Sequence, residues 1–262
     1  LPLPLWDPLI WGGLAGAGRL RSMGNRVFLP DTLGNRLFIF EEGDSPRGER
    51  LSLPQPAVVV PLSPARGWVL QADGRILEIW KNPLNDRYET KPLGDLRGGV
   101  TDGVALSARA VAVADRLGNQ VRFHRRGDWK VYATWEPQGE SEKLLFEPVA
   151  LDLSGPFLAV ADRGRGRVHV LDVFTLKERE RFDLPLVRDL LWNQEGGLFL
   201  LTEDGKLLRT PPLPLRGRAP ELLAEGLQDA WSLCQVRGRL LAVDQEGRRW
   251  WEGPVGPDSR VR

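Results

Sequence analysis

Short apolar runs recur along the chain, and each is ended by a polar turn that leads into another apolar run. The run at residues 111–114 closes at Asp115, and the run at residues 158–161 closes at Asp162. Short apolar runs bounded by Asp, Gly and Asn are typical of β-strands joined by tight turns. No segment shows a convincing helical period. The pattern therefore predicts an all-β fold.

The strand–turn–strand unit occurs six times at a nearly constant spacing. Each copy carries an aspartate in its turn, and successive aspartates lie 42, 42, 47, 42 and 40 residues apart. They are Asp31, Asp73, Asp115, Asp162, Asp204 and Asp244. The longest step coincides with a polar insertion at residues 138–143, which we interpret as a surface loop. A period of about 40 residues suits one four-stranded propeller blade.

Six such units predict a single six-bladed β-propeller domain over residues 1–262, with four-stranded antiparallel blades. The expected blades cover residues 17–55, 56–98, 99–140, 145–186, 187–226 and 227–256. Residues 3–11 resemble residues 184–192, which lead from one blade into the next. We therefore expect residues 1–10 to form the outer strand of the last blade and to close the ring. Proline is tolerated there, because the outer strand of a blade is an edge strand.

The fourth copy carries the fullest version of the repeat. It runs from Glu-Pro-Val-Ala-Leu-Asp-Leu-Ser-Gly at residues 147–155 to Arg-Val-His-Val-Leu at residues 167–171. This pattern resembles the NHL repeat; the first and third copies fit it well, and the other three fit it loosely. The resemblance implies a propeller but does not imply an activity. NHL-like propellers commonly present one face of the ring to a protein or to another partner.

The six turn aspartates have a structural interpretation. A carboxylate that opens a tight turn accepts hydrogen bonds from the backbone N–H groups of the residues that follow. A basic residue comes next in most copies, and we expect it to pair with a carboxylate of the neighbouring blade. These basic residues are Arg36, Arg75, Arg167, Lys206 and Arg248. The repeated charges would then hold the blades in register.

Four further carboxylates define a candidate ligand site. Counting back 15 residues from the turn aspartate, or 13 in the third copy, gives a carboxylate just before the innermost strand of copies three to six. They are Asp102, Glu147, Asp189 and Asp229. We expect them at the mouth of the central channel, where a divalent cation such as calcium would relieve their repulsion. In the alternative, each carboxylate caps its own loop and the channel holds only water. Trp231 and Trp192 lie nearby in sequence and would form an aromatic wall for a cationic ligand.

The composition narrows the function classes. The chain has 36 basic and 35 acidic residues and a net charge of +1, which gives no general attraction to nucleic acid or to anionic membranes. No apolar run is long enough to span a membrane as a helix. Cys234 is the single cysteine, so no intrachain disulfide forms. The scarcity of cysteine and methionine resembles the usage of thermophiles and predicts a thermostable protein.

Enzymatic motifs are scarce as well. The two histidines, His124 and His169, both fall in expected strands, which leaves no convincing zinc cluster and no Ser-His-Asp set. The chain begins at Leu1 rather than at a methionine. We expect an exported protein (periplasmic, on the cell surface or secreted) rather than a cytoplasmic one.

Three functions remain open from the sequence. The leading hypothesis is a non-catalytic propeller that binds or scaffolds proteins as an extracellular or cell-surface assembly component. The alternative is a metal-dependent hydrolase or lactonase resembling the gluconolactonase group, whose six-bladed propellers hold a divalent cation with carboxylates and an asparagine. This chain offers the four carboxylates but no obvious asparagine at the channel. A third hypothesis, binding of single-stranded RNA, is opposed by the expected acidic mouth.

Overall fold

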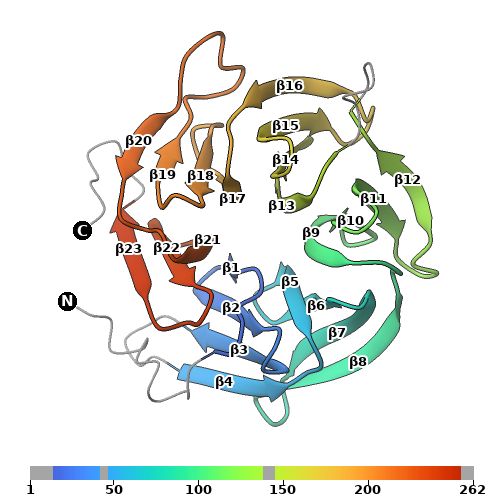
Figure 1. Ribbon diagram of the computed structural model, residues 1–262. Helices are drawn as coiled ribbons and strands as arrows, with labels where there is room; N and C mark the ends of the chain where they lie inside the picture. Colours follow the sequence, from blue (N-terminus) through green and yellow to red (C-terminus); the bar gives the residue numbers. More distant parts are fainter. Residues whose placement is uncertain (1–13, 42–46, 138–144, 255–262) are drawn as a thin grey trace. The chain divides into compact units, whose positions relative to one another are not determined.

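The described chain consists of strands and turns. A computed structural model describes residues 14–41, 47–137 and 145–254, and none of these residues is helical. Their strands form six small antiparallel sheets, which are the six blades of a β-propeller (Figure 1). The predicted all-β, six-bladed propeller is thus confirmed. The described residues contain no helix that is long and apolar enough to cross a membrane.

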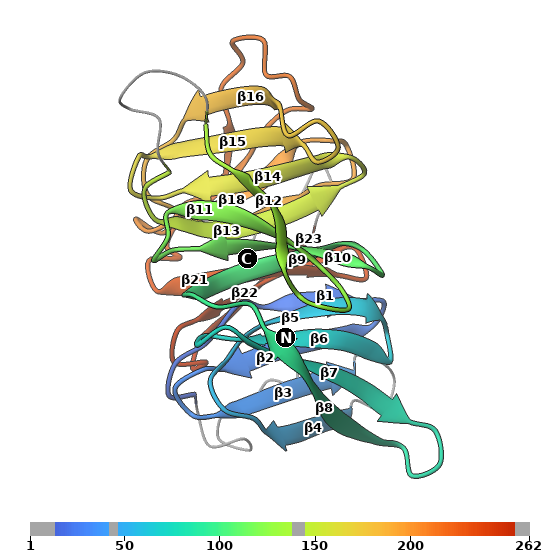
Figure 2. The same cartoon turned by 90° about the vertical axis from the view of Figure 1, so that its right-hand side faces the viewer.

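Within each blade the strands are paired in the order in which they follow one another along the chain. The first three blades contain β1 (Arg21–Met23), β2 (Arg26–Asp31), β3 (Arg36–Glu41) and β4 (Arg47–Ser52); β5 (Pro56–Ser63), β6 (Arg66–Gln71), β7 (Arg75–Asn82) and β8 (Arg87–Asp95); and β9 (Val100–Ser107), β10 (Ala110–Asp115), β11 (Gln120–Arg125) and β12 (Val131–Trp135). The other three contain β13 (Pro148–Ser154), β14 (Phe157–Asp162), β15 (Arg167–Asp172) and β16 (Glu178–Asp183); β17 (Val187–Trp192), β18 (Leu198–Thr202), β19 (Leu207–Arg209) and β20 (Glu221–Ala224); and β21 (Ala230–Val236), β22 (Arg239–Asp244) and β23 (Trp250–Pro254). Figure 2 shows this order clearly for β13 to β16, which lie one beyond another.

The sixth blade has three strands within the described residues, whereas each of the other five has four. The strand expected at residues 1–10 lies outside the described residues. Each of the six sheets falls inside one of the expected blade ranges.

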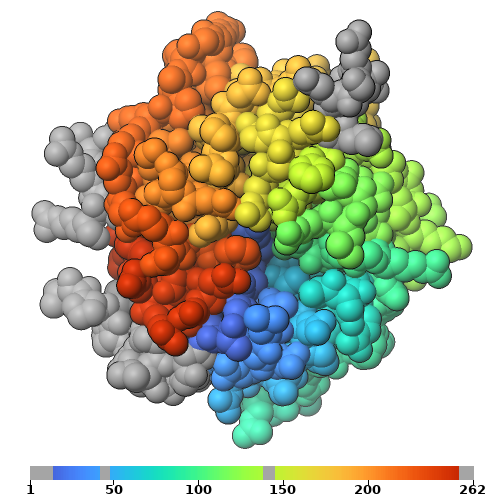
Figure 3. Space-filling model, viewed as in Figure 1, coloured from blue at the N-terminus to red at the C-terminus, as the bar shows by residue number. Residues whose placement is uncertain are grey.

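The chain forms two compact units. Unit 1 consists of Leu1–Asp95 and Asp229–Arg262, and it holds the first, second and sixth blades. Unit 2 consists of Leu96–Gln228 and holds the third, fourth and fifth blades. In the space-filling view, the first blade (blue) and the sixth blade (red) of unit 1 lie against each other (Figure 3).

The core of unit 1 lies in layers between neighbouring blades. Successive side chains of a strand point to opposite faces, so one strand serves two layers. Val27 and Leu29 of β2 pack in a cluster with Leu241 and Val243 of the sixth blade. Phe28, between them, packs instead with Val59 and Val69 of the second blade. Burial on both faces explains why these strands are almost continuously apolar.

Unit 2 is built in the same way. Leu158 and Val160 of β14 pack with Phe123 of the third blade. Ala159 and Ala161 of the same strand pack with Leu190 and Leu200 of the fifth blade. Like β2 in unit 1, β14 is therefore shared by two layers of the core.

The second strand of each blade ends at a polar residue. In four blades this residue is one of the predicted turn aspartates: Asp31, Asp115, Asp162 and Asp244. In the second and fifth blades it is Gln71 and Thr202, so Asp73 and Asp204 lie two residues further along, inside the turn. Asp73 accepts hydrogen bonds from the backbone N–H and the Nε of Arg75, and Asp204 pairs with Lys206. Each of these two shorter turns contains an Asp-Gly pair, which made Asp73 and Asp204 look equivalent to the other four turn aspartates. In the structure the equivalent positions are Gln71 and Thr202, two residues earlier.

Candidate functional site

The four predicted channel carboxylates occupy two kinds of position. Asp102 and Asp189 lie inside β9 and β17, opposite Ala114 and Leu201, and both are fully buried. Glu147 and Asp229 immediately precede β13 and β21. The expected location, just before the innermost strand, therefore holds for two of them, while the other two lie within that strand.

The buried carboxylates of unit 2 bind backbone N–H groups. Asp102 accepts hydrogen bonds from Gly103 N at 2.8 Å and from Leu151 N, in the next blade, at 2.7 Å. Asp189 accepts one from Leu190 N at 2.9 Å. Asp152, which the sequence reasoning missed, repeats the contact between blades by accepting from Trp192 N at 2.7 Å. A carboxylate inside an otherwise apolar inner strand was the available signal, because a buried charge needs donors.

Glu147 belongs to a chain of ion pairs that crosses three blades of unit 2. Its carboxylate pairs with Arg116, which follows β10, and with Arg163, which follows β14, at 3.5 Å. Arg163 also pairs with Glu203, which follows β18, at 2.6 Å. The backbone N–H of Glu147 donates to Asn119 Oδ1 at 2.9 Å, and its φ is 69°. The residue is held by protein partners on both sides.

Asp229, in unit 1, pairs with Arg249 at 2.6 Å, and both side chains are mostly exposed. Each of the four predicted carboxylates thus has a partner from the protein. Among the residues that the structure describes, no group of three or more His, Cys, Asp or Glu side chains is arranged to hold a metal ion. Asp102 and Glu147 contact residues of neighbouring blades, and Asp189 and Asp229 contact residues of their own blades.

The two tryptophans of the predicted aromatic wall make contacts within the protein. The Arg19 guanidinium lies 5.3 Å from the centre of the Trp231 ring, within the range of a cation–π contact. The Trp192 indole N–H donates to the carbonyl oxygen of Asp152 at 3.0 Å. Both rings therefore have internal partners, one of them a cation of the protein itself.

Three exposed apolar side chains accompany the ion-pair chain. Leu117 is 80% exposed, Phe146 is 54% exposed and Leu186 is 46% exposed. Leu117 and Phe146 are adjacent in sequence to Arg116 and Glu147, and the carbonyl oxygen of Leu186 accepts from Glu203 N at 2.8 Å. We call these seven residues the loop face of unit 2: Arg116, Leu117, Phe146, Glu147, Arg163, Leu186 and Glu203.

Two of these apolar side chains lie directly against glycines. A Cβ on Gly99 would lie 2.5 Å from Leu117 Cγ, and a Cβ on Gly164 would lie 2.0 Å from Phe146 Cδ1. Any side chain at either glycine would displace the apolar group above it. Sequence reasoning missed all three apolar residues; for Leu117 the available signal was its place between the polar residues of a tight turn. The exposure of Phe146 and Leu186 left no such signal.

The two histidines lie in β11 and β15, and both are buried. His169 Nδ1 is 2.6 Å from Glu178 Oε1, and its Nε2 is 3.7 Å from Asp162 Oδ2. Burial alone would lower the pKa of His169, but the Asp162 and Glu178 carboxylates outweigh it and raise that pKa. Burial lowers the pKa of His124, and its Nδ1 lies 2.8 Å from a neutral acceptor, the carbonyl oxygen of Trp129.

The two histidines are expected to give opposite pH dependences of stability. Protonated His169 stabilises the fold at pH values below the ordinary pKa of 6.5, and this contribution is lost as the pH rises through the raised pKa. His124 stays neutral when folded, so stability falls as the pH drops below 6.5 and the unfolded chain takes up the proton. Urea unfolding of the His169→Gln and His124→Gln variants between about pH 5.5 and pH 8.5 measures both effects. The assignment is contradicted if the difference in unfolding free energy between wild type and variant changes with pH in the same direction for both variants.

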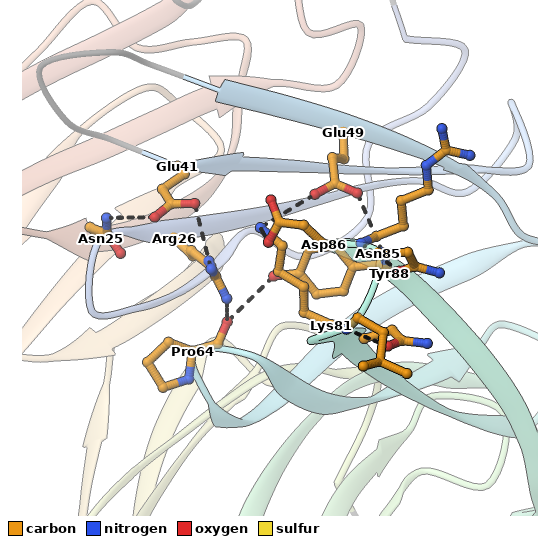
Figure 4. A network of polar contacts seen from close by, with 12 residues as sticks. Asn25, Arg26, Glu41, Glu49, Pro64, Lys81, Asn85, Asp86 and Tyr88 are labelled. Carbon is orange, nitrogen blue, oxygen red and sulfur yellow. Dashed lines mark hydrogen bonds and ion pairs between the residues drawn. The ribbon is translucent and has the colours of Figure 1, made fainter.

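A cleft in unit 1 is the second candidate site (Figure 4). It lies between strands of the first and second blades and has a volume of about 680 Å³. Its lining residues are Arg26, Ile39, Glu41, Gly48, Glu49, Arg50, Leu51, Lys81, Asn85, Asp86, Arg87 and Tyr88. The Tyr88 ring is buried between the Arg26 guanidinium at 5.8 Å and the Lys81 ammonium at 6.0 Å. Burial raises the pKa of Tyr88 to about 12, against an opposing effect of Arg26. The phenol is therefore neutral at physiological pH.

Sequence reasoning did not find this cleft. Most of its charged residues come from β3, β4, β7, β8 and the turn between β7 and β8, while Arg26 lies in β2, and nothing in the repeat marks them. No protein-family model matches the chain, and no curated protein matches it in sequence. The functional argument therefore rests on the two surfaces themselves, the loop face of unit 2 and the cleft of unit 1.

Proposed function

We propose that this chain is a non-catalytic, NHL-like propeller that binds protein partners and acts as a scaffold. The observation that carries the proposal is the loop face of unit 2. There, three exposed apolar side chains, two of which lie against glycines, accompany ion pairs that link three blades.

This composition is that of a protein-binding surface. Protein interfaces combine apolar and aromatic anchors with arginine, while lysine is depleted in them. The loop face offers Phe146 with two leucines, and its cations are Arg116 and Arg163. Isolated exposed ion pairs contribute little to stability, about 0–1 kcal/mol each. Their value here is geometric, because they hold loops of three blades in fixed relation for a partner.

The contacts of the histidines and carboxylates in the described residues also favour binding over catalysis. The described histidines are buried in strands, where they contact Trp129, Glu178 and Asp162. The buried carboxylate of Asp102 and the half-buried carboxylate of Asp152 accept hydrogen bonds from backbone N–H groups of neighbouring blades. These groups support the fold, and the exposed groups of the loop face are those of recognition.

An affinity experiment with matched variants tests the proposal. The immobilised protein is incubated with an extract of the cells that produce it, and retained proteins are identified by mass spectrometry. The Leu117→Asp/Phe146→Asp variant should lose the retained partners, because it places charges in the apolar part of the loop face. The Phe174→Asp variant is the control. Phe174 is 84% exposed in the same unit but lies in the β15–β16 turn, at the opposite ends of the strands.

Retention by the wild type and by Phe174→Asp, with loss in the double variant, supports the proposal. Equal retention by all three, or no protein held above the bare matrix, would overturn it. Circular dichroism of each variant checks that the β-sheet content is unchanged.

A further inference from the structure

The cleft of unit 1 has cations on its floor and carboxylates nearer its opening. The Arg26 and Lys81 side chains are each only 13% exposed, whereas the Glu41, Glu49 and Asp86 side chains are 32–71% exposed. Charged groups lose solvation when buried, so the two cations need counterions at close range. The three carboxylates supply them.

Each of those carboxylates is already engaged. Glu41 pairs with Arg26 at 3.5 Å and accepts from Asn25 at 3.3 Å. Glu49 lies 3.8 Å from the Lys81 ammonium and accepts from Tyr88 N at 3.4 Å. Asp86 pairs with Lys81 at 2.9 Å, and Figure 4 shows the network. Each carboxylate therefore has a partner from the protein, and Arg26 and Lys81 balance two of the three negative charges.

Two arginines of the cleft are different. Arg50 and Arg87 are exposed, and within the described part of the chain neither guanidinium makes an ion pair. The lining has four cationic and three anionic side chains, so one net positive charge remains at a site where both open guanidinium groups are accessible. A guanidinium binds a carboxylate through two parallel hydrogen bonds, which gives geometric selectivity as well as attraction.

An apolar anchor point borders the same cleft. Leu84 is 94% exposed in the turn that also supplies Asn85 and Asp86 to the lining. Leu51 and the Tyr88 ring line the cleft itself. Apolar contact surrounded by polar groups is the usual composition of a protein-binding site. Nucleic acid fits less well, because three carboxylates lie where a phosphate backbone would pass.

We infer that this cleft is a second protein-binding site, which takes an acidic peptide segment that also carries apolar residues. The glutamates or aspartates of the segment pair with Arg50 and Arg87, and its apolar side chains contact Leu84, Leu51 and the Tyr88 ring. The site goes beyond the proposed function, because it uses other residues in the other unit. A scaffold needs at least two binding surfaces, and this cleft supplies one besides the loop face.

Peptide titrations test the inference. A short fluorescein-labelled peptide of glutamates and leucines is titrated with the full chain at low salt, and fluorescence anisotropy is recorded. A peptide with glutamine in place of every glutamate is the comparison. We expect saturable binding of the glutamate peptide, with an affinity that falls as salt screens the charges. The glutamine peptide should bind at least about tenfold more weakly.

Variants locate the binding. Arg50→Glu/Arg87→Glu changes exposed side chains and should weaken binding of the glutamate peptide by at least about tenfold. Arg109→Glu/Arg125→Glu makes the same charge change on exposed arginines that do not line the cleft, and it should bind within about twofold of the wild type. Leu84→Ser should weaken binding without altering its salt dependence.

The inference is overturned if the wild type shows no saturable binding, if both peptides bind equally, or if the two arginine pairs have the same effect. The loop-face variant Leu117→Asp/Phe146→Asp separates this result from the proposed function. It should bind the glutamate peptide like the wild type even where it has lost partners from an extract. Loss of peptide binding in that variant would also overturn the assignment to the cleft.

Discussion

Replacement of Asp31 by alanine is expected to lower the free energy of unfolding by about 3–5 kcal/mol, the range for breaking a buried charge pair. The carboxylate is fully buried, and it accepts hydrogen bonds from the backbone N–H groups of Ala15, Gly16 and Gly34 at 3.0–3.1 Å. It also accepts from Arg36 Nε at 2.9 Å. Alanine would leave these donors without an acceptor in a site that water reaches poorly.

Asp73 is the matched control for Asp31. Both were predicted as turn aspartates from the same repeat, but Asp73 is 38% exposed, and within the described residues its hydrogen bonds and ion pair are all with Arg75. Asp73→Ala should therefore cost less than about 1 kcal/mol. Urea unfolding followed by tryptophan fluorescence measures both variants. Similar losses would show that the two aspartates are equivalent after all.

The second large effect is expected at Asp102. Its carboxylate is fully buried and joins two blades through Gly103 N and Leu151 N. Each buried donor left without an acceptor costs about 1–3 kcal/mol, so Asp102→Ala, which strands two donors, should lower the unfolding free energy by about 2–6 kcal/mol. The Asp102→Asn variant keeps one acceptor oxygen and should lose less.

Asp183 provides the control for Asp102. It lies in the same unit and also contacts another strand, through Arg167 at 3.1 Å, but its side chain is 83% exposed. Asp183→Ala should be nearly neutral. If Asp102→Ala is as stable as Asp183→Ala, the carboxylate of Asp102 does not join the blades. Urea midpoints and thermal unfolding of the variants decide the question.

The fold was predictable because its signal is local and repeated. Apolar runs such as 111–114 and 158–161 are buried on both faces, so they read as strands without knowledge of their neighbours. The turn residues mark where each strand ends. The shift at Asp73 and Asp204 has a local cause too: a turn one residue shorter between Gln71 and Arg75 moves the aspartate away from the strand end. Residue type alone does not distinguish the two positions.

The candidate sites were less predictable, because the side chains that contact one another in them come from different blades. The sequence places Glu147 near an inner strand correctly, but Arg116 and Arg163, with which it pairs, lie 31 and 16 residues away. Whether a carboxylate meets a cation, a guanidinium or a backbone N–H depends on how neighbouring blades face each other. The cleft depends largely on side chains of β3, β4, β7 and β8, and the repeat does not show that these strands line one cleft.

Because the side chains of β2 alternate between two layers of the core, the number of residues in this strand cannot change freely. Val27 and Leu29 contact the sixth blade, while Phe28 contacts the second. Removal of a single residue before Val27 within that strand would exchange these assignments and present each side chain to the wrong layer. Inner strands of this propeller should therefore accept insertions or deletions only in pairs of residues. The turns, which have no such parity, are where the copies are free to differ in length.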